Sequence, residues 1–171
     1  MKAKRPTPKK KPAKRRRPLR PTPKPRSVNT TGRAPVPEAE VVLVPTRGTP
    51  GRGAGPGGEA WRIDAAGARA GVVFINCIDE PPVGKHASIQ IYLNAPSQGR
   101  RIGRAGYRKA CAASRYSTIY AHMQHKNVAS IRAAKEAGFV DATPSGHSQV
   151  IMVWKRPATG APAVATAIGT G

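Results

Sequence analysis

The spacing at which apolar residues recur along the chain changes between residues 87 and 113. Apolar and polar residues alternate over residues 87–94, a period of two that is typical of a half-buried strand. From Ile102 onward, small or apolar residues recur at helical spacing, at positions 105, 106, 110 and 113. A helix that connects two strands in this way is a crossover, which joins parallel strands. We therefore expect one parallel pair of strands in this chain.

Further strands are predicted on both sides of this unit. Runs rich in Val and Ile and bounded by turn residues favour strands at 40–44, 61–64, 69–78, 118–123, 140–143 and 149–154. Asn127 is a suitable N-cap for a second helix at 128–137, and Gly138 stands where a helix C-cap favours glycine. The expected fold class is α+β (mixed α/β), with a central mixed sheet flanked by helices.

The first 26 residues cannot contribute to a hydrophobic core. They hold 13 of the 30 Lys and Arg residues of a chain whose net charge is +22, and they contain no carboxylate. Like charges repel and prolines remove backbone donors, so a solvated, extended arm is expected. We divide the chain into a disordered basic arm and linker (1–36), a first strand and Gly/Pro loop (37–59), one folded domain (60–156) and a disordered tail (157–171).

The basic N-terminus lacks the apolar segment of a signal peptide. No apolar run approaches the roughly 20 residues that a membrane span needs. We therefore expect a cytoplasmic protein that has no membrane partner.

The cysteines and histidines form no recognisable metal motif. Cys77 and Cys111 are far apart and in no CxxC pattern, which fits a reducing cytosol rather than a disulfide framework. His122 and His125, on a strand that runs into a loop, would not share a face, and no cysteine or carboxylate stands at matching spacing. No metal site is expected.

Residues 98–104 lie between the predicted strand and helix and contain two glycines and three arginines. The start of a helix has unpaired N–H groups and the positive end of the helix dipole, which together bind phosphate. Glycine lets an anion approach the backbone, and arginine adds forked donors. Taken alone, the segment fits a phosphate site and a plain strand-to-helix turn with solvated arginines equally well.

Residues 91–139 resemble the GNAT (N-acetyltransferase) superfamily in two motifs. The first is similar to that family's pyrophosphate motif, Gln/Arg-x-x-Gly-x-Gly/Ala, after its fourth strand. Gln98 and Gly103 fill its first and last places, and Arg101 stands where the middle glycine is usual. A second register, from Arg100 to Ala105, also fits.

The second motif is similar to the family's Asn-x-x-Ala/Ser helix after strand five, which ends in Gly-Phe. Here Asn127 and Ser130 are followed by Gly138 and Phe139. Many relatives have a tyrosine seven residues after the asparagine, where this chain has Ala134. The chain is therefore more similar to the ribosomal-protein acetyltransferase branch, in which serine can protonate the leaving thiolate.

This resemblance implies an acetyl-CoA site and transfer of the acetyl group to an amine by direct attack. The backbone of the fourth strand's end would pair with pantetheine, through Tyr92, Leu93 and Asn94. Asn127 would lie near pantetheine, and Ser130 is the only candidate catalytic acid. Main-chain N–H groups would bind the pyrophosphate, from Gln98, Gly99, Arg100, Arg101, Ile102, Gly103 and Arg104.

No general base can be assigned by resemblance. The family often places a glutamate on the fourth strand, but this strand offers Ser88 and Gln90. Asp79, Glu80 and His86 lie in or beside a predicted turn, and we interpret each as a solvated turn residue. Water can remove the proton of a positioned amine, so the protein need not supply a base.

The expected acceptor site is incomplete. The family normally has two helices between its first two strands, and these wall the acceptor cleft. Residues 45–60 are Gly-rich and too few for both helices. We therefore expect an open acceptor site, or one completed by a partner chain in a homodimer.

Two functions fit the sequence. The first is an N-acetyltransferase that acts on an unidentified amine acceptor, either a protein or a small molecule. The second is a protein that binds nucleic acid or another polyanion through residues 2–26, with a degenerate or CoA-sensing GNAT-like domain. The enzyme is preferred, because two spaced motifs are more specific than a run of charge.

Overall fold

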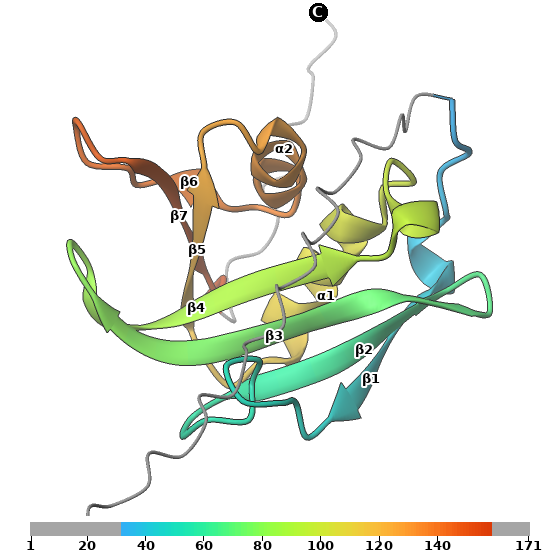
Figure 1. The fold of residues 1–171 in the computed structure, drawn as a ribbon, viewed down its shortest axis with the longest axis horizontal. Coiled ribbons are helices and arrows are strands. Elements are labelled where there is room, and N and C mark those ends of the chain that lie inside the picture. Colours follow the sequence, from blue (N-terminus) through green and yellow to red (C-terminus); the bar gives the residue numbers. More distant parts are fainter. Residues whose placement is uncertain (1–31, 159–171) are drawn as a thin grey trace, which may run out of the picture.

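The structure is a computed structural model that describes residues 32–158. One mixed sheet of seven strands forms its centre, in the order β1-β2-β3-β4-β5-β7-β6, and two α-helices pack against it (Figure 1). The predicted α+β class is confirmed. The basic arm expected at residues 1–26 and the end of the tail, 159–171, lie outside the described residues.

The first four strands form an antiparallel meander, preceded by a short 3-10 helix, η1 (Glu38–Glu40). The predicted first strand is present as β1, which pairs along its whole length with β2. β3 and β4 are longer than predicted, because their pairing continues to Glu80 and Gly84 beside the turn. The strands are β1 (Val41–Thr46), β2 (Glu59–Ala65), β3 (Ala68–Glu80) and β4 (Gly84–Leu93).

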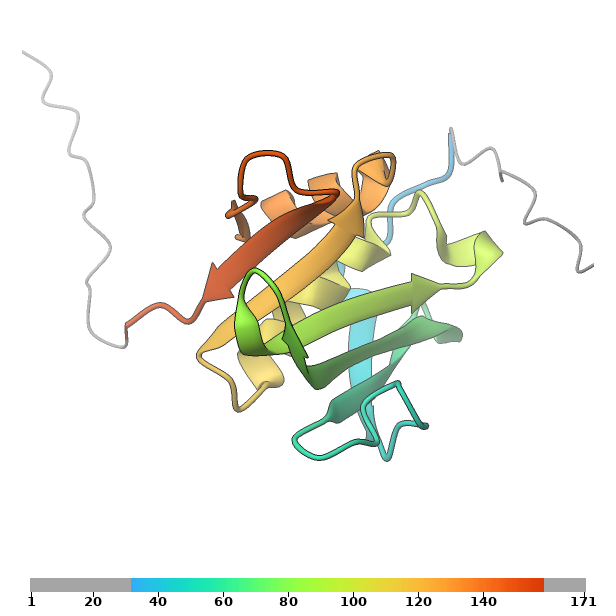
Figure 2. The ribbon, with the colours of Figure 1, turned by 60° about the vertical axis from the view of Figure 1, so that its left-hand side comes forward.

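The crossover predicted from the change of period is confirmed. β4 leads through the 3-10 helix η2 (Ala95–Ser97) to α1 (Ile102–Ala113) and then to β5 (Thr118–Gln124), which runs parallel to β4. In the described part of the chain, the pairing of β4 with β5 is confined to Ser88 and Tyr120. Beyond that pair the two strands diverge (Figures 1 and 2). The crossover therefore leaves a gap between the carboxyl ends of β4 and β5.

The chain then forms α2 (Val128–Glu136), β6 (Val140–Asp141) and β7 (Gln149–Lys155). Gly138 follows α2 with φ +96°, the left-handed conformation expected after a helix. The strand predicted at 140–143 is longer than the observed β6. Oγ1 of Thr143 accepts the N–H of Ile151 at 2.9 Å in place of a backbone carbonyl, so the β6–β7 ladder ends there.

Both helices pack on one face of the sheet. α1 lies very close to the strands at Gly106, where a Cβ would be 2.7 Å from Cδ1 of Ile91 and 3.3 Å from Cδ1 of Ile63. Tyr107 of α1 meets Phe139 edge to face, with ring centroids 5.6 Å apart. Neither helix has the length and apolarity to cross a membrane, and no other α-helix occurs in residues 32–158.

The opposite face of the sheet is covered by no α-helix of the described chain. The connection between β1 and β2, residues 47–58, is a loop, as the shortness of this segment predicts. Asn76 of β3 holds it, since Oδ1 accepts the N–H of Gly53 and Nδ2 donates to the carbonyl of Gly51, each at 2.8 Å. We call this face the open face.

Arg156 joins the end of β7 to the C-terminal end of α1. Its guanidinium donates to the carbonyls of Cys111, Ala112, Ser114 and Tyr116. Arg156→Gln should lower the free energy of unfolding by about 1–2 kcal/mol, because charged hydrogen bonds to the helix end are lost. Urea denaturation measures this loss. The control Lys155→Gln, at the adjacent exposed position, should change stability by less than about 0.5 kcal/mol, and equal losses would contradict the assignment.

Candidate functional site

The N-terminus of α1 has free backbone donors. The helix begins at Ile102, and its N-cap residue, Arg101, makes no side-chain capping hydrogen bond. The N–H groups of Ile102, Gly103 and Arg104 have no acceptor within residues 32–158. Together with the positive end of the helix dipole, these groups can bind an anion beside the end of β4.

Arg101 adopts a conformation that favours glycine. Its φ is +62°, in the left-handed region, and it follows Gly99 at φ +76°. A residue with a Cβ adopts this conformation at a cost of roughly 1–2 kcal/mol. The turn therefore needs a positive φ at the position where the resembling motif has its middle glycine. The exposed side chain of Arg101 is available to contact a ligand.

The segment before η1 packs along this turn, which the sequence did not predict. The N–H of Val36 donates to the carbonyl of Arg100 at 3.0 Å, and Nε of Arg100 donates to the carbonyl of Ala34 at 3.2 Å. The guanidinium of Arg33 donates to the carbonyls of Ala95 and Gln98. Three carbonyls, of Ala95, Gln98 and Arg100, and the Arg100 side chain are thus engaged with residues 33–36.

The end of β4 is held by side chains of the following loop. Nε2 of Gln98 donates to the carbonyl of Leu93 at 3.1 Å. Oδ1 of Asn94 accepts the N–H of Ser97 at 3.0 Å, and its Nδ2 donates to the carbonyl of Arg69 at 2.7 Å. The side chains of Gln98 and Asn94 therefore shape the loop.

Tyr92 differs from its neighbours because it lies on the open face. Half of its side chain is exposed (51%), and its ring stacks on Phe74 with centroids 5.8 Å apart. The guanidinium of Arg52, from the β1–β2 loop, lies 5.2 Å from the centre of the same ring. Tyr92 thus contacts the β1–β2 loop through Arg52.

Gly103 and Arg104 face the second helix. A Cβ on Gly103 would lie 3.7 Å from Cβ of Ala133 and 3.8 Å from Cδ1 of Leu93, which are ordinary contacts. Nη1 of Arg104 lies 3.6 Å from Glu136, while its buried Nε has no partner among the described residues. A hydrogen bond from Arg132, and the charges of nearby arginines including Arg104, lower the pKa of Glu136. The charge of Arg104 is therefore partly compensated.

The N-cap predicted for the second helix is confirmed. Oδ1 of Asn127 accepts the N–H of Ser130 at 3.3 Å. Nδ2 of Asn127 and Oγ of Ser130 have no hydrogen-bond partner in the described part of the chain. Both polar groups lie at the start of α2, directly after β5, and are free to meet a ligand.

The interpretation of His86 as a solvated turn residue is wrong. His86 lies within β4 and is only 8% exposed, because the strand begins at Gly84. Its Nε2 lies 2.8 Å from Nε2 of His122 on β5, and its Nδ1 lies 2.6 Å from the carbonyl of Gly84. Asp79 and Glu80 are exposed at the end of β3. No local sequence pattern predicts this histidine pair, since 36 residues separate its members.

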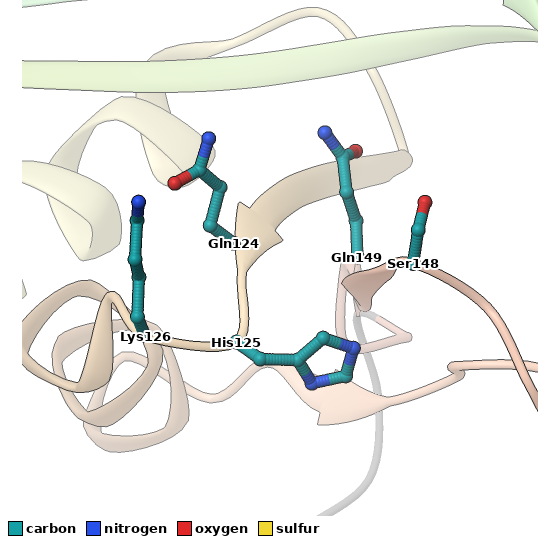
Figure 3. Close-up of a pocket in the computed structure, with 5 residues that line it drawn as sticks. All are labelled: Gln124, His125, Lys126, Ser148 and Gln149. Atoms are coloured by element: carbon teal, nitrogen blue, oxygen red, sulfur yellow. The ribbon is translucent and has the colours of Figure 1, made fainter.

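A hollow of about 480 Å³ lies where β5 ends and β7 begins. In Figure 3, Gln124 and Gln149 point toward β4, and His125 points away from it. The hollow adjoins Asn127 in sequence, and its lining is polar. The lining residues are Gln124, His125, Lys126, Ser148 and Gln149.

A second hollow, of about 450 Å³, lies at the other end of β5. Its lining includes Cys77, whose Sγ lies 2.9 Å from Oη of Tyr116.

The other cysteine, Cys111, is buried in α1. Burial raises the pKa of its thiol to about 12, so this thiol is unreactive at neutral pH. No group of three or more His, Cys, Asp or Glu residues is arranged to hold a metal ion in residues 32–158.

Comparison with known proteins identifies the fold. No protein-family model and no curated protein matches the sequence. An acetyltransferase of the GNAT family from Streptococcus agalactiae 2603 has a similar structure, with a TM-score of 0.50 and 11% identity over 58% of this chain and 66% of that chain. The GNAT domain of PAT from S. lividans has a TM-score of 0.49 and 15% identity, covering 57% and 60%. This chain thus has a GNAT-like fold and spans less than two thirds of the length of these two proteins.

Arg101→Gly should stabilise the protein by about 1 kcal/mol, because glycine adopts the left-handed conformation without the steric cost of a Cβ. Thermal denaturation measures the change. Arg100→Gly is the matched control, since Arg100 has an ordinary φ and a hydrogen bond to Ala34, and this variant should be less stable than the wild type. A fall in stability for both variants would show that the Arg101 side chain stabilises the turn.

Proposed function

We propose that this protein binds acetyl-CoA and transfers its acetyl group to an amine. The observation that carries the proposal is the start of α1, where three N–H groups have no acceptor among the described residues and lie beside the end of β4. A pyrophosphate is the part of acetyl-CoA that such a helix end suits. The GNAT-like fold supports this choice of ligand.

The cofactor would lie along the gap between β4 and β5. Pantetheine would pair with the free edge of β4 near Tyr92, Leu93 and Asn94, since the pairing with β5 is confined to Ser88. The backbone of residues 98–104 would hold the pyrophosphate. Arg101, which is exposed, would add a charged donor. Nδ2 of Asn127 would donate to pantetheine.

Catalysis would proceed by direct attack of the amine on the thioester carbonyl. Backbone N–H groups of β4 would stabilise the developing negative charge on the carbonyl oxygen. Oγ of Ser130 would protonate the thiolate as it leaves. The acceptor would approach over the open face, where the β1–β2 loop takes the place of two helices. Similarity to the ribosomal-protein acetyltransferase branch and a homodimer stay predictions, and the amine acceptor is unidentified.

Gly103→Glu should abolish CoA binding, because a carboxylate in the first turn of α1 would repel the negatively charged pyrophosphate. Gly103→Gln is the matched control, since it has the same size without the charge. Calorimetry should show weaker binding for Gln than for wild type and none for Glu. Circular dichroism checks the fold of both variants. Equal affinity of the Glu and Gln variants would contradict an anion site at this helix end.

Ser130→Ala should keep the affinity for CoA and lower the rate of acetyl transfer by at most roughly 10²-fold, the effect of one acid–base group. Release of free CoA thiol measures the rate. Ser145→Ala, at an exposed turn position that lines neither hollow, is the control and should leave the rate unchanged. An unchanged rate in Ser130→Ala would mean that solvent protonates the thiolate.

A further inference from the structure

The two imidazoles on the open face have no role in the mechanism above. His86 of β4 and His122 of β5 meet through their Nε2 atoms, 2.8 Å apart, across the place where the two strands separate. We propose that His122 is the general base that takes the proton of the acceptor amine, and that His86 is the positioning residue that sets its tautomer. This inference rests on the proposed acetyl transfer.

The hydrogen bonds of His86 determine which nitrogen of His122 is free. A carbonyl oxygen only accepts, so Nδ1 of His86, 2.6 Å from the carbonyl of Gly84, carries a proton. In neutral His86, Nε2 is then an acceptor, and it receives its hydrogen bond from Nε2–H of His122. The remaining nitrogen of His122, Nδ1, has a lone pair and no hydrogen-bond partner within residues 32–158. It is therefore available to accept a proton.

The surroundings keep His122 neutral. Burial and the neighbouring His86 lower its pKa, and His147, on the connection between β6 and β7, acts in the same direction. Glu80, at the end of β3, acts in the opposite direction but more weakly than His86. Tyr120 faces the His86 ring edge to face, with centroids 5.0 Å apart. His122 thus stays in the basic form down to mildly acidic pH.

His122 also lies beside the hollow at the end of β5. It pairs with Ile151 of β7, and the next pair on the same face is Gln124 with Gln149, which line the hollow (Figure 3). The base would therefore stand between the strand gap, where the thioester is proposed to lie, and the polar hollow through which an amine can approach.

The proposed step balances without another reactant. The amine nitrogen forms a bond to the thioester carbonyl carbon, and its proton passes to Nδ1 of His122. The C–S bond then breaks, and the thiolate of CoA leaves and is protonated. His122 returns its proton to solvent. The products are an N-acetylated amine and free CoA thiol.

The tautomers can be tested without turnover. Nitrogen-15 NMR of the imidazoles should show the proton of His122 on Nε2, the proton of His86 on Nδ1, and a pKa for His122 below that of an unperturbed histidine, about 6.5. A His122 proton on Nδ1, or a pKa above this value, would overturn the inference. This measurement decides the question even for an acceptor that the protein turns over poorly.

Kinetics with glycinamide as the amine probe test the base directly. For the wild type, kcat should rise with pH through a midpoint below about 6.5 and then level off. His122→Gln should lower kcat by about 10²–10³-fold and move the midpoint toward the pKa of the probe's amine, about 8. The affinity for CoA should not change. The control Lys155→Gln, at an exposed position at the far end of β7 from the hollow, should match the wild type.

Two variants of His86 test its positioning role separately from the role of His122 as the base. His86→Leu should shift the pH profile of kcat as His122→Gln does, whereas His86→Gln, whose amide oxygen can accept from His122, should restore most of it. A His122→Gln variant that binds CoA and keeps the wild-type profile would overturn the inference and leave the proposed function in place. A wild type that binds no CoA would overturn the proposed function, and the inference with it.

Discussion

The close approach of α1 to the sheet is the contact on which the rest of the site depends. It is made at Gly106, where a Cβ would come within 2.7 Å of Ile91. A helix held this close by backbone and small side chains has little freedom to slide. Its first turn is therefore fixed beside the end of β4, with Gly103 against Leu93 and Ala133. The free N–H groups of this turn therefore lie beside the end of β4.

Two connections between strands leave the open face of the sheet accessible. The crossover pairs β4 with β5 only at Ser88 and Tyr120, so the strands part toward their carboxyl ends. The β1–β2 connection is a loop, held by Asn76, and adds no helix over the open face. Of the two histidines near the gap, His122 is therefore partly exposed on this face, whereas His86 is buried.

The arginines around the start of α1 are not equivalent. Arg104 is paired with Glu136, and Arg33 and Arg100 donate to backbone carbonyls, so each of these three has an internal partner. Among the loop arginines, Arg101 alone has a left-handed conformation, and its exposed side chain has no carboxylate within 4.0 Å among the described residues. An anion at this helix end would therefore be held chiefly by backbone groups. The side chains mainly fix the turn.

The sequence by itself determined the elements and the start of the candidate site. The change in the spacing of apolar residues predicts the β4–α1–β5 crossover, and Asn127 and Gly138 predict the ends of α2. These signals depend only on neighbours within a few residues. Tertiary structure alone decided the contacts between distant segments. It brought Arg33 onto the loop after β4, and it paired His86 with a histidine 36 residues away. Such hydrogen bonds depend on how strands are arranged in the sheet, which no local pattern encodes.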